Sequence, residues 1–378
     1  MNSGEWLLLI AIVAWSICTG LVPAGADAGV GVLAALRVLL GLAEGLALPA
    51  VHSMISSYIP AKEQSTVASV ITASCYIGAL LSNLVTPILI ERNGWESSFY
   101  VFAVLPIIWV PLWLCYILSN SSEGVTSLQR KDEAYEAADE VSIKQLLSQR
   151  PVWAIMLAQY GQGVGNIGLL SWLPTYYSEN FHVPLSNLAK FTVLPYFLQM
   201  GMAIGAGYLA DYMIVNYVCI GKLTVRNFFQ LGGSFLPALF LLLCVYGVPG
   251  GIIGAEYSKD MSAESAEKLI TLGSACTALT VASVSCNHFD ISPKNSGTIF
   301  GLGNTVSCIG GLLAVSTTGY IYDETHSWDL IFALFAFHYV FFGGILWLFL
   351  ASADNIENGP LSFDGVKNND NSQNPLNL

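Results

Sequence analysis

The stretch "SCYIGALLSNLVTPILIERNGWESSFYVFA" (74–103) recurs in the second half of the chain as "SCIGGLLAVSTTGYIYDETHSWDLIFALFA" (307–336), without a gap. Each copy holds an apolar run, a short polar loop with a tryptophan, and the start of another apolar run. At an offset of 233 residues, the positions of the first copy that meet an identical residue include Ser74, Cys75, Gly78, Leu80, Trp95, Phe99, Phe102 and Ala103. The chain therefore contains an internal repeat whose copies run in the same direction.

The composition is that of a membrane protein. The 378 residues are 54% hydrophobic and only 11% charged, whereas a soluble domain carries about 25% charged residues. Several apolar runs reach the roughly 20 residues that cross a bilayer core. We predict an all-α polytopic membrane protein with ten spanning helices at residues 5–26, 30–57, 66–90, 97–118, 152–177, 189–214, 225–248, 268–289, 298–321 and 329–351.

Polar segments divide the chain. Residues 119–150 are polar and of mixed charge, which predicts a linker with a partly helical stretch between an N-terminal half (1–118) and a six-helix C-terminal half (151–353). The Asn-rich tail, 354–378, is expected to be disordered. A cytoplasmic linker puts nine Lys and Arg residues on its side of the membrane and four on the other. The linker is therefore predicted to be cytoplasmic.

Several classes of function are disfavoured. The net charge of −12 comes from acids in loops and tail, which argues against a nucleic-acid partner. The eight cysteines form no CxxC pair, so neither a disulfide framework nor a metal site is implied. The chain lacks GxSxG and HExxH motifs, so we expect no enzyme and no bound cofactor. We expect a monomer in the lipid bilayer, and the sequence does not say in which membrane.

The repeat also indicates an architecture. Parallel halves related by an axis along the membrane normal are the arrangement of the major facilitator superfamily. In the second half, the predicted helices 152–177 and 189–214 precede the counterpart of residue 1. The first half has no equivalent of these two helices. We therefore expect the chain to lack helices 1 and 2 of a twelve-helix fold, and to begin at helix 3.

Short motifs carry a family resemblance over almost the whole chain. The stretch "RVLLGLAEGLALPA" (37–50) resembles the helix-4 signature of the anion–cation symporter family, which includes sialin, vesicular glutamate transporters and plant anion or phosphate transporters. Other stretches that resemble this family are "IPAKEQS" (59–65), "NGWESSFYVFA" (93–103), "LLSWLPTYYSENFHV" (169–183) and "SGTIFGLGNT" (296–305). The resemblance implies a secondary active transporter of inorganic phosphate or small organic anions. Its coupling ion would be Na⁺ or H⁺, with membrane potential as the other driving force.

Arg37 and Glu44 stand alone inside an apolar helix. A central Arg costs about 2.5–3.5 kcal/mol to insert, so such residues usually face a bundle interior or an aqueous cavity. Arg37 either reaches the outer interface or offers its forked donors to an anion, and the resemblance supports the second role. Glu44 follows seven residues later on almost the same face. The resemblance implies a proton-coupling or gating carboxylate, and a structural partner for a neighbouring helix is the alternative.

Three further residues complete the candidate site. Asp211 lies in "GYLADYM" (207–213), which resembles the superfamily's loop motif between helices 8 and 9. The resemblance implies that Asp211 braces a neighbouring helix end and gates the cytoplasmic side, with Lys222 and Arg226 as basic partners. The alternative is a solvated acid at a helix end. Gln162 and Asn166 are expected to face the cavity as substrate-binding residues. Family members that transport glutamate carry an arginine near Gln162, which weakens a dicarboxylate substrate here.

A second hypothesis stays open. A chain without helices 1 and 2 loses part of one cavity wall, so it also fits a truncated or degenerate family member without transport activity. His52, near the predicted cytoplasmic end of its helix, is interpreted as an interfacial polar residue rather than a proton carrier.

Overall fold

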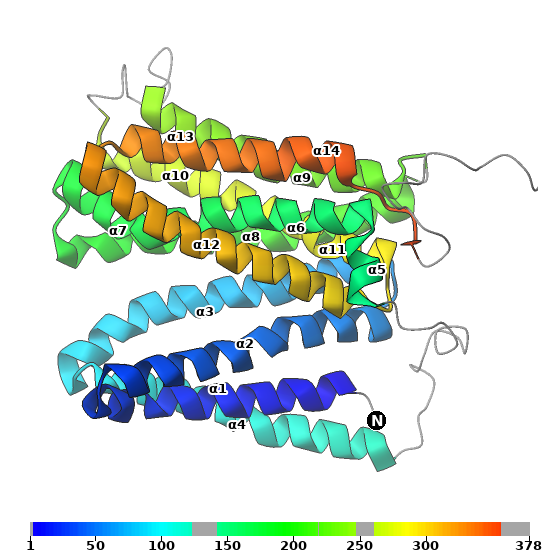
Figure 1. Cartoon of the computed structure of the whole chain (residues 1–378), viewed down its shortest axis with the longest axis horizontal. Coiled ribbons are helices and arrows are strands. Elements are labelled where there is room, and N and C mark those ends of the chain that lie inside the picture. The colour runs from blue at the N-terminus through cyan, green and yellow to red at the C-terminus, as the bar shows by residue number, and fades with distance from the viewer. Residues whose placement is uncertain (1–2, 123–141, 218, 247–260, 357–378) are drawn as a thin grey trace, which may run out of the picture.

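The computed structural model describes residues 3–122, 142–217, 219–246 and 261–356. Long helices run side by side in this part of the chain (Figure 1). The predicted linker falls mostly outside the described residues, which resume at 142 with the short helix α5 (Ile143–Leu147). Of the tail predicted to be disordered (354–378), residues 357–378 also lie outside the described residues, whereas Ile356 is buried in a core cluster with Trp347. We call the end of the bundle that carries α5 the linker end, and the opposite end the far end.

Four long helices precede the linker. Their bounds are α1 (Ser3–Ala28), α2 (Val30–Tyr58), α3 (Gln64–Asn93) and α4 (Glu96–Ser122). Helix α4 extends four residues beyond the predicted domain boundary at 118. Gly29, which joins α1 to α2, has a φ of 111°, and Gly94, before α4, has a φ of 84°. Glycine adopts such angles readily, so both tight connections at the far end depend on it.

The second half contains both continuous and interrupted helices. Its elements are α6 (Arg150–Gln162), η2 (Gly163–Ile167), α7 (Gly168–Phe181), α8 (Leu185–Asn216), α9 (Lys222–Tyr246), α10 (Ala263–Thr277), η5 (Ala278–Ala282), α11 (Val284–Ile291), α12 (Ser296–Thr325), α13 (Trp328–His338), η6 (Tyr339–Ile345) and α14 (Leu346–Leu350). Within the described ranges, nine helices are long and apolar enough to cross a membrane. The remaining predicted span is the run α6–η2–α7, whose polar residues Gln159, Gln162 and Asn166 make it less apolar.

The repeat is present in the helices. Helix α2 and the run α10–η5–α11 both contain 29 residues, and they begin at 30 and 263 and end at 58 and 291. This is the offset of 233 residues seen in the sequence. Helices α3 and α12 both contain 30 residues, and a tryptophan, Trp95 or Trp328, follows each. Glu44 of α2 therefore corresponds to Thr277 of α10.

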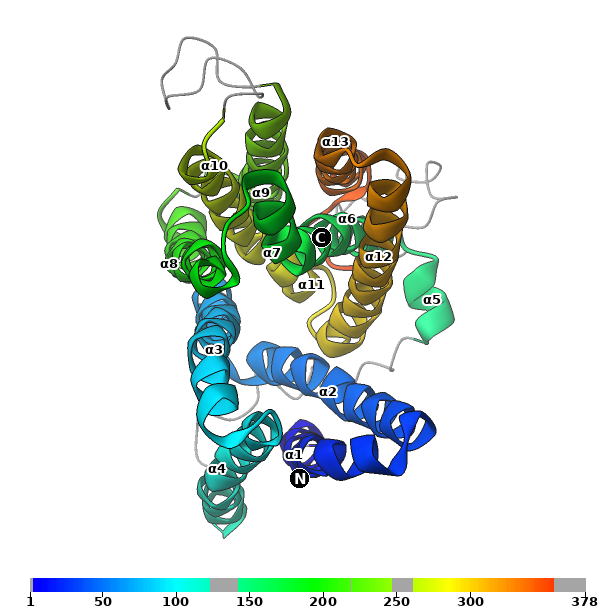
Figure 2. The same ribbon diagram turned by 90° about the vertical axis from the view of Figure 1, so that its left-hand side faces the viewer.

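The two halves meet along two helix pairs. Helix α3 packs against α8, and α2 packs against α12 (Figure 2). Near the linker end, a glycine allows the two helices of each pair to lie close together. A Cβ at Gly207 of α8 would lie 2.5 Å from the carbonyl oxygen of Ser65, and one at Gly297 of α12 would lie 2.7 Å from that of Pro49. Backbones approach closely at such small residues, which is how membrane helices gain packing contacts.

The glycines of the α6–η2–α7 run also serve packing. A Cβ at Gly163 would collide with the backbone of Ser307 on α12, and one at Gly165 would collide with the ring of Tyr339 on η6. Both glycines belong to a π-helical turn, Gly163–Ile167, and such turns bend helices. The glycines of this run therefore allow both close packing and bending.

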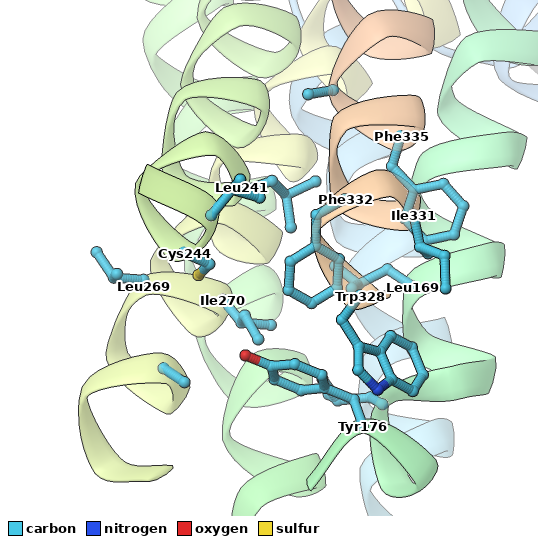
Figure 3. Close-up of a cluster of buried hydrophobic side chains, with 14 of the residues drawn as sticks. Leu169, Tyr176, Leu241, Cys244, Leu269, Ile270, Trp328, Ile331, Phe332 and Phe335 are labelled. Carbon is cyan, nitrogen blue, oxygen red and sulfur yellow. The ribbon is translucent and has the colours of Figure 1, made fainter. Parts of the chain in front are cut away.

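The core of the second half lies toward the far end. Tyr176 packs against Trp328 and Phe332, with ring centroids 5.2 and 4.9 Å away (Figure 3). Leu241 and Ile270 close the same cluster from α9 and α10. Inside a bilayer the lipid tails are as apolar as these side chains, so close packing rather than exclusion of water holds the cluster together.

Candidate anion-binding and gating sites

Arg37 and Glu44 lie on one exposed face of α2. The helix buries a different stripe, Leu40, Ala43 and Ala47, of which Ala47 packs against α1. Both charged side chains are exposed. Ile55, eighteen residues or five turns beyond Arg37, continues their face and packs with α3 and α11 at the linker end. The face that carries the two charges is therefore turned away from α1 and toward the interior of the helix arrangement.

The guanidinium of Arg37 has an aromatic neighbour and no ionic one. Its Cζ lies 5.5 Å from the ring centroid of Phe99 on α4, a cation–π contact. Among the described residues, no carboxylate oxygen lies within 4.0 Å of it. Glu44 also forms no ion pair or hydrogen bond within the described ranges. The spacing of seven residues separates the two groups by about 10 Å along the axis, so each remains available to a ligand.

A pocket of about 350 Å³ is lined by residues of α1 and α3 and by residues at the start of α4, one of which is Phe99, the aromatic neighbour of Arg37. Its walls combine hydroxyl groups with aromatic and apolar side chains: Thr19, Ser82, Thr86, Ser98, Ile90, Trp95, Phe99 and Phe102. Ser98 is 7% exposed, and its Oγ has no hydrogen-bond partner among the described residues. Hydroxyl groups are hydrogen-bond donors that can bind an oxyanion.

A polar cluster joins three elements of the second half. Gln199 of α8 is fully buried, and its Nε2 donates to Asn166 Oδ1 on η2 at 3.1 Å and to Thr277 Oγ1 on α10 at 3.2 Å. Sequence reasoning singled out Asn166 but missed both partners. The signal for Gln199 was present, because it is the lone amide in the apolar run "YFLQMGMAIG" (196–205), and polar groups in membrane helices are costly.

Gln162 does not belong to this cluster. Its Nε2 donates to the carbonyl oxygen of Gly233 on α9 at 3.2 Å. The side chain therefore joins two helices within the second half, and its expected place in the substrate cavity stays a prediction. In a regular α-helix, Gln162 and Asn166 would share a face, being four residues apart. The π-helical turn from Gly163 onward changes the angular step per residue, so that rule does not hold here.

Asp211 joins the halves at the linker end. Its carboxylate accepts hydrogen bonds from the backbone N–H groups of Ser65 at 3.2 Å and Thr66 at 2.7 Å. These residues lie in the first turn of α3, where backbone N–H groups have no partner within the helix. A carboxylate at a helix N-terminus is also favoured by the helix dipole. The side chain of Asp211 is 5% exposed, so it is a buried cap on a helix of the other half and not a solvated acid.

The basic residues after Asp211 pair with a different acid. Arg226 Nε lies 2.8 Å from Asp290 Oδ2, and Lys222 Nζ lies 3.7 Å from Asp290 Oδ1. Among the described residues neither Lys222 nor Arg226 lies within ion-pair distance of Asp211, although the charges of Arg226 and Asp211 interact. Arg226 Nη1 reaches the same helix end by another route, donating to Ser65 Oγ at 2.9 Å and to the carbonyl oxygen of Ala282 at 2.7 Å. Asp211 and Arg226 thus hold one end of α3 from two helices.

A second contact between the halves involves two histidines. His52 Nδ1 of α2 lies 3.0 Å from His288 Nε2 of α11, and both rings are buried. The ring of His52 stacks on Phe300 with centroids 3.7 Å apart. The interpretation of His52 as an interfacial residue is therefore wrong. Hydrogen bonds between described residues of the two halves all lie at the linker end, so this end is closed.

Comparisons with known proteins agree with this architecture. The model of the Major Facilitator Superfamily matches residues 4–315. The chain is 29% identical to "Probable anion transporter 4, chloroplastic" of Oryza sativa subsp. japonica, over 93% of the chain and 58% of the relative. It is 29% identical to "Sodium-dependent phosphate transport protein 1, chloroplastic" of Arabidopsis thaliana, over 93% of the chain and 67% of the relative. Sialin of Ovis aries is 30% identical, over 96% of the chain and 72% of the relative.

The chain thus spans about three fifths of the length of the first of these relatives. Among solved structures, the proton:xylose symporter XylE bound to 6-bromo-6-deoxy-D-glucose matches with a TM-score of 0.67 at 15% identity. That match covers 93% of this chain and 82% of the symporter chain. This likeness concerns the fold alone. The chain is an integral, multi-pass membrane protein that belongs to the major facilitator superfamily and, within it, to the anion–cation symporter family.

Proposed function

We propose that this protein is a secondary active transporter of inorganic phosphate or a small organic anion. One observation carries the proposal: the guanidinium of Arg37 has no carboxylate within ion-pair distance among the described residues, and its aromatic neighbour Phe99 lines a pocket that contains four hydroxyl side chains. An unpaired guanidinium in a membrane helix is costly unless it meets an anion or water. The relatives named as phosphate and anion transporters support the same class of substrate.

The chemistry of the site favours an oxyanion. Arg37 can offer two parallel N–H donors to two oxygens of one phosphate or carboxylate group. Of the pocket hydroxyls, the unpartnered Oγ of buried Ser98 is free to add a further donor. Because the site holds a single Arg and no neighbouring Lys, it suits one anionic group better than two. A monovalent carboxylate or inorganic phosphate therefore fits better than a dicarboxylate.

Glu44 supplies the means of coupling. It follows Arg37 on the same face of α2 about two turns deeper, and within the described ranges no cation lies within ion-pair distance of it. A free carboxylate at this depth can take up H⁺ or Na⁺ and thereby offset the charge of the bound anion. We assign it the coupling role. The driving ion is H⁺ if Glu44 is protonated during the cycle, and Na⁺ if it is not.

Alternating access would be controlled by the linker end. Transporters of this architecture expose a central site to each side in turn by rocking one half against the other. Here the capping of α3 by Asp211 and the contact of His52 with His288 close the linker end. Rocking toward the other state has to break these contacts. With a cytoplasmic linker, the structure corresponds to the conformation that receives substrate from the opposite side.

Uptake by the purified chain in liposomes tests the proposal. We expect uptake of radiolabelled phosphate above that of empty liposomes, driven by an imposed Na⁺ gradient, pH gradient or membrane potential applied one at a time. Unlabelled monocarboxylates and dicarboxylates added as competitors then rank the organic anions. A folded, monodisperse protein that takes up neither phosphate nor any competing anion under all three gradients would contradict the proposal. That result would favour the second hypothesis, a family member without transport activity.

A further inference from the structure

The cluster around Gln199 has a defined hydrogen-bond direction. Thr277 Oγ1 donates its single hydrogen to the carbonyl oxygen of Ser274, at 2.6 Å. The hydroxyl can therefore only accept from Gln199, 3.2 Å away, so the amide nitrogen of Gln199 must face it. The same nitrogen lies 3.1 Å from the amide of Asn166, which must then present its oxygen to Gln199. The Nδ2 group of Asn166, which carries two N–H donors, then points away from Gln199.

The free amide group lies at the border of the buried region. Gln199 is fully buried, whereas Asn166 is half-buried. Among the described residues, Asn166 Nδ2 has no hydrogen-bond partner, and Asn166 sits on the π-helical turn Gly163–Ile167. Such turns widen the helix and often occur at functional sites. An amide with two unpaired donors, fixed by a buried neighbour, is a preorganised anion contact.

The repeat relates this cluster to the charged face of α2. Thr277 occupies the position of the second half that Glu44 occupies in the first, at the offset of 233 residues. Helices related in this way present equivalent faces about the pseudo-twofold axis between the halves. The first half thus offers Arg37 and Glu44 where the second half offers the cluster of Asn166, Gln199 and Thr277.

We infer that Asn166 Nδ2 is the anion contact of the second half and that Gln199 is the positioning residue that fixes its orientation. This inference rests on the proposed anion transport. Arg37 supplies the charge from one half, and the neutral amide supplies hydrogen bonds from the other. A site divided in this way can release its anion when the halves move apart, because the second half holds no countercharge in the cluster. Among the described residues, Gln199 forms hydrogen bonds with Asn166 and Thr277 alone, so it acts through them and not on the substrate.

Reversal of the hydrogen-bond direction tests the inference. A Gln199→Glu carboxylate accepts hydrogen bonds, so it would draw the N–H donors of Asn166 inward and turn its oxygen toward the anion. We expect the KM for phosphate uptake to rise about tenfold. The matched control is Gln230→Glu, because Gln230 is equally buried in the same half and bonds to Gly343. It places the same carboxyl group away from Asn166, so its KM should stay within about twofold of wild type.

Two substitutions of Thr277 provide a milder test. Thr277→Val removes the acceptor that orients Gln199, and Thr277→Ser retains it. We expect KM to rise severalfold in the first variant and not in the second. Equal KM values for this pair, or a Gln199→Glu variant that matches Gln230→Glu, would overturn the inference while anion uptake itself persists. Absence of uptake by the wild-type chain would overturn the proposed function, and this inference with it.

Discussion

Asp211 of α8 accepts a 2.7 Å hydrogen bond from the backbone N–H of Thr66, the third residue of α3 in the other half. The carboxylate replaces the partner that this N–H cannot find within its own helix. One side chain thereby satisfies two N–H groups and joins the two halves of the molecule at the linker end. Separation of the halves at this end leaves the carboxylate and both N–H groups without these partners.

Removal of this carboxylate should loosen the linker end. We expect Asp211→Ala to cost about 1–2 kcal/mol of stability, because a helix cap and a charge at the helix dipole are both lost. Asp211→Asn should cost less, because its amide oxygen still accepts one hydrogen bond. Thermal unfolding in detergent measures both effects. Asp323→Asn, an exposed acid at the far end, is the control, and an Asp211→Ala variant as stable as this control would contradict the capping role.

Gly207 tests the close approach of α8 to α3. In Gly207→Ala, the new methyl group would lie 2.5 Å from the carbonyl oxygen of Ser65 and would also collide with the side chain of Ser69. We expect a loss of about 1–3 kcal/mol from overpacking. Gly205→Ala is a matched control two residues away on the same helix, because nothing lies within 4 Å of its added Cβ. Equal melting temperatures for the two variants would show that the halves do not approach here.

The histidine contact predicts a further loss. In His52→Ala, a cavity forms against Phe300 and the buried ring nitrogen of His288 loses its partner. We expect about 2–4 kcal/mol of destabilisation from the two causes together. His326→Asn is the control, because His326 is exposed and asparagine tolerates its φ of 49°. A His52→Ala protein as stable as this control would remove the pair from the contacts that close the linker end.

Glu44 should be needed for coupling and not for binding. In Glu44→Gln, the side chain keeps its size but can no longer take up a cation. We expect uptake driven by an ion gradient to fall to the level of uncoupled flux, while exchange of phosphate for phosphate across the membrane persists. Counterflow and gradient-driven uptake in the same liposomes measure the two processes. Equal loss of both would assign Glu44 to anion binding or to packing instead.

The sequence predicted the architecture better than the side-chain contacts. Apolar length and the repeat located the nine described helices that are long and apolar enough to cross a membrane, because the bilayer fixes the length of a spanning helix and the repeat fixes the register of α2 against residues 263–291. The shared face of Arg37 and Glu44 followed from helical geometry alone. Contacts between helices were harder to predict. The pairing of Arg226 with Asp290, and that of His52 with His288, depend on how separate helices approach one another.

The relative placement of Gln162 and Asn166 has a local cause. Residues four apart share a face of a regular α-helix. The π-helical turn from Gly163 onward changes the angular step per residue, so that rule does not hold here. The stretch "GQGVGN" (161–166) does not indicate whether a π turn or an α turn forms. Gln199 and Thr277 were overlooked because a single polar residue in an apolar run does not reveal which neighbouring helix it meets.

The uptake rate of radiolabelled phosphate at a subsaturating concentration, compared between Arg37→Gln and Lys144→Gln in liposomes, tests the central claim most directly. Lys144 is an exposed cation of α5 at the linker end, so its loss removes the same charge away from the proposed site. We predict that Arg37→Gln lowers the rate at least tenfold, because a charge-assisted, bidentate contact is lost, whereas Lys144→Gln transports at the wild-type rate. Retained uptake by Arg37→Gln would contradict the account.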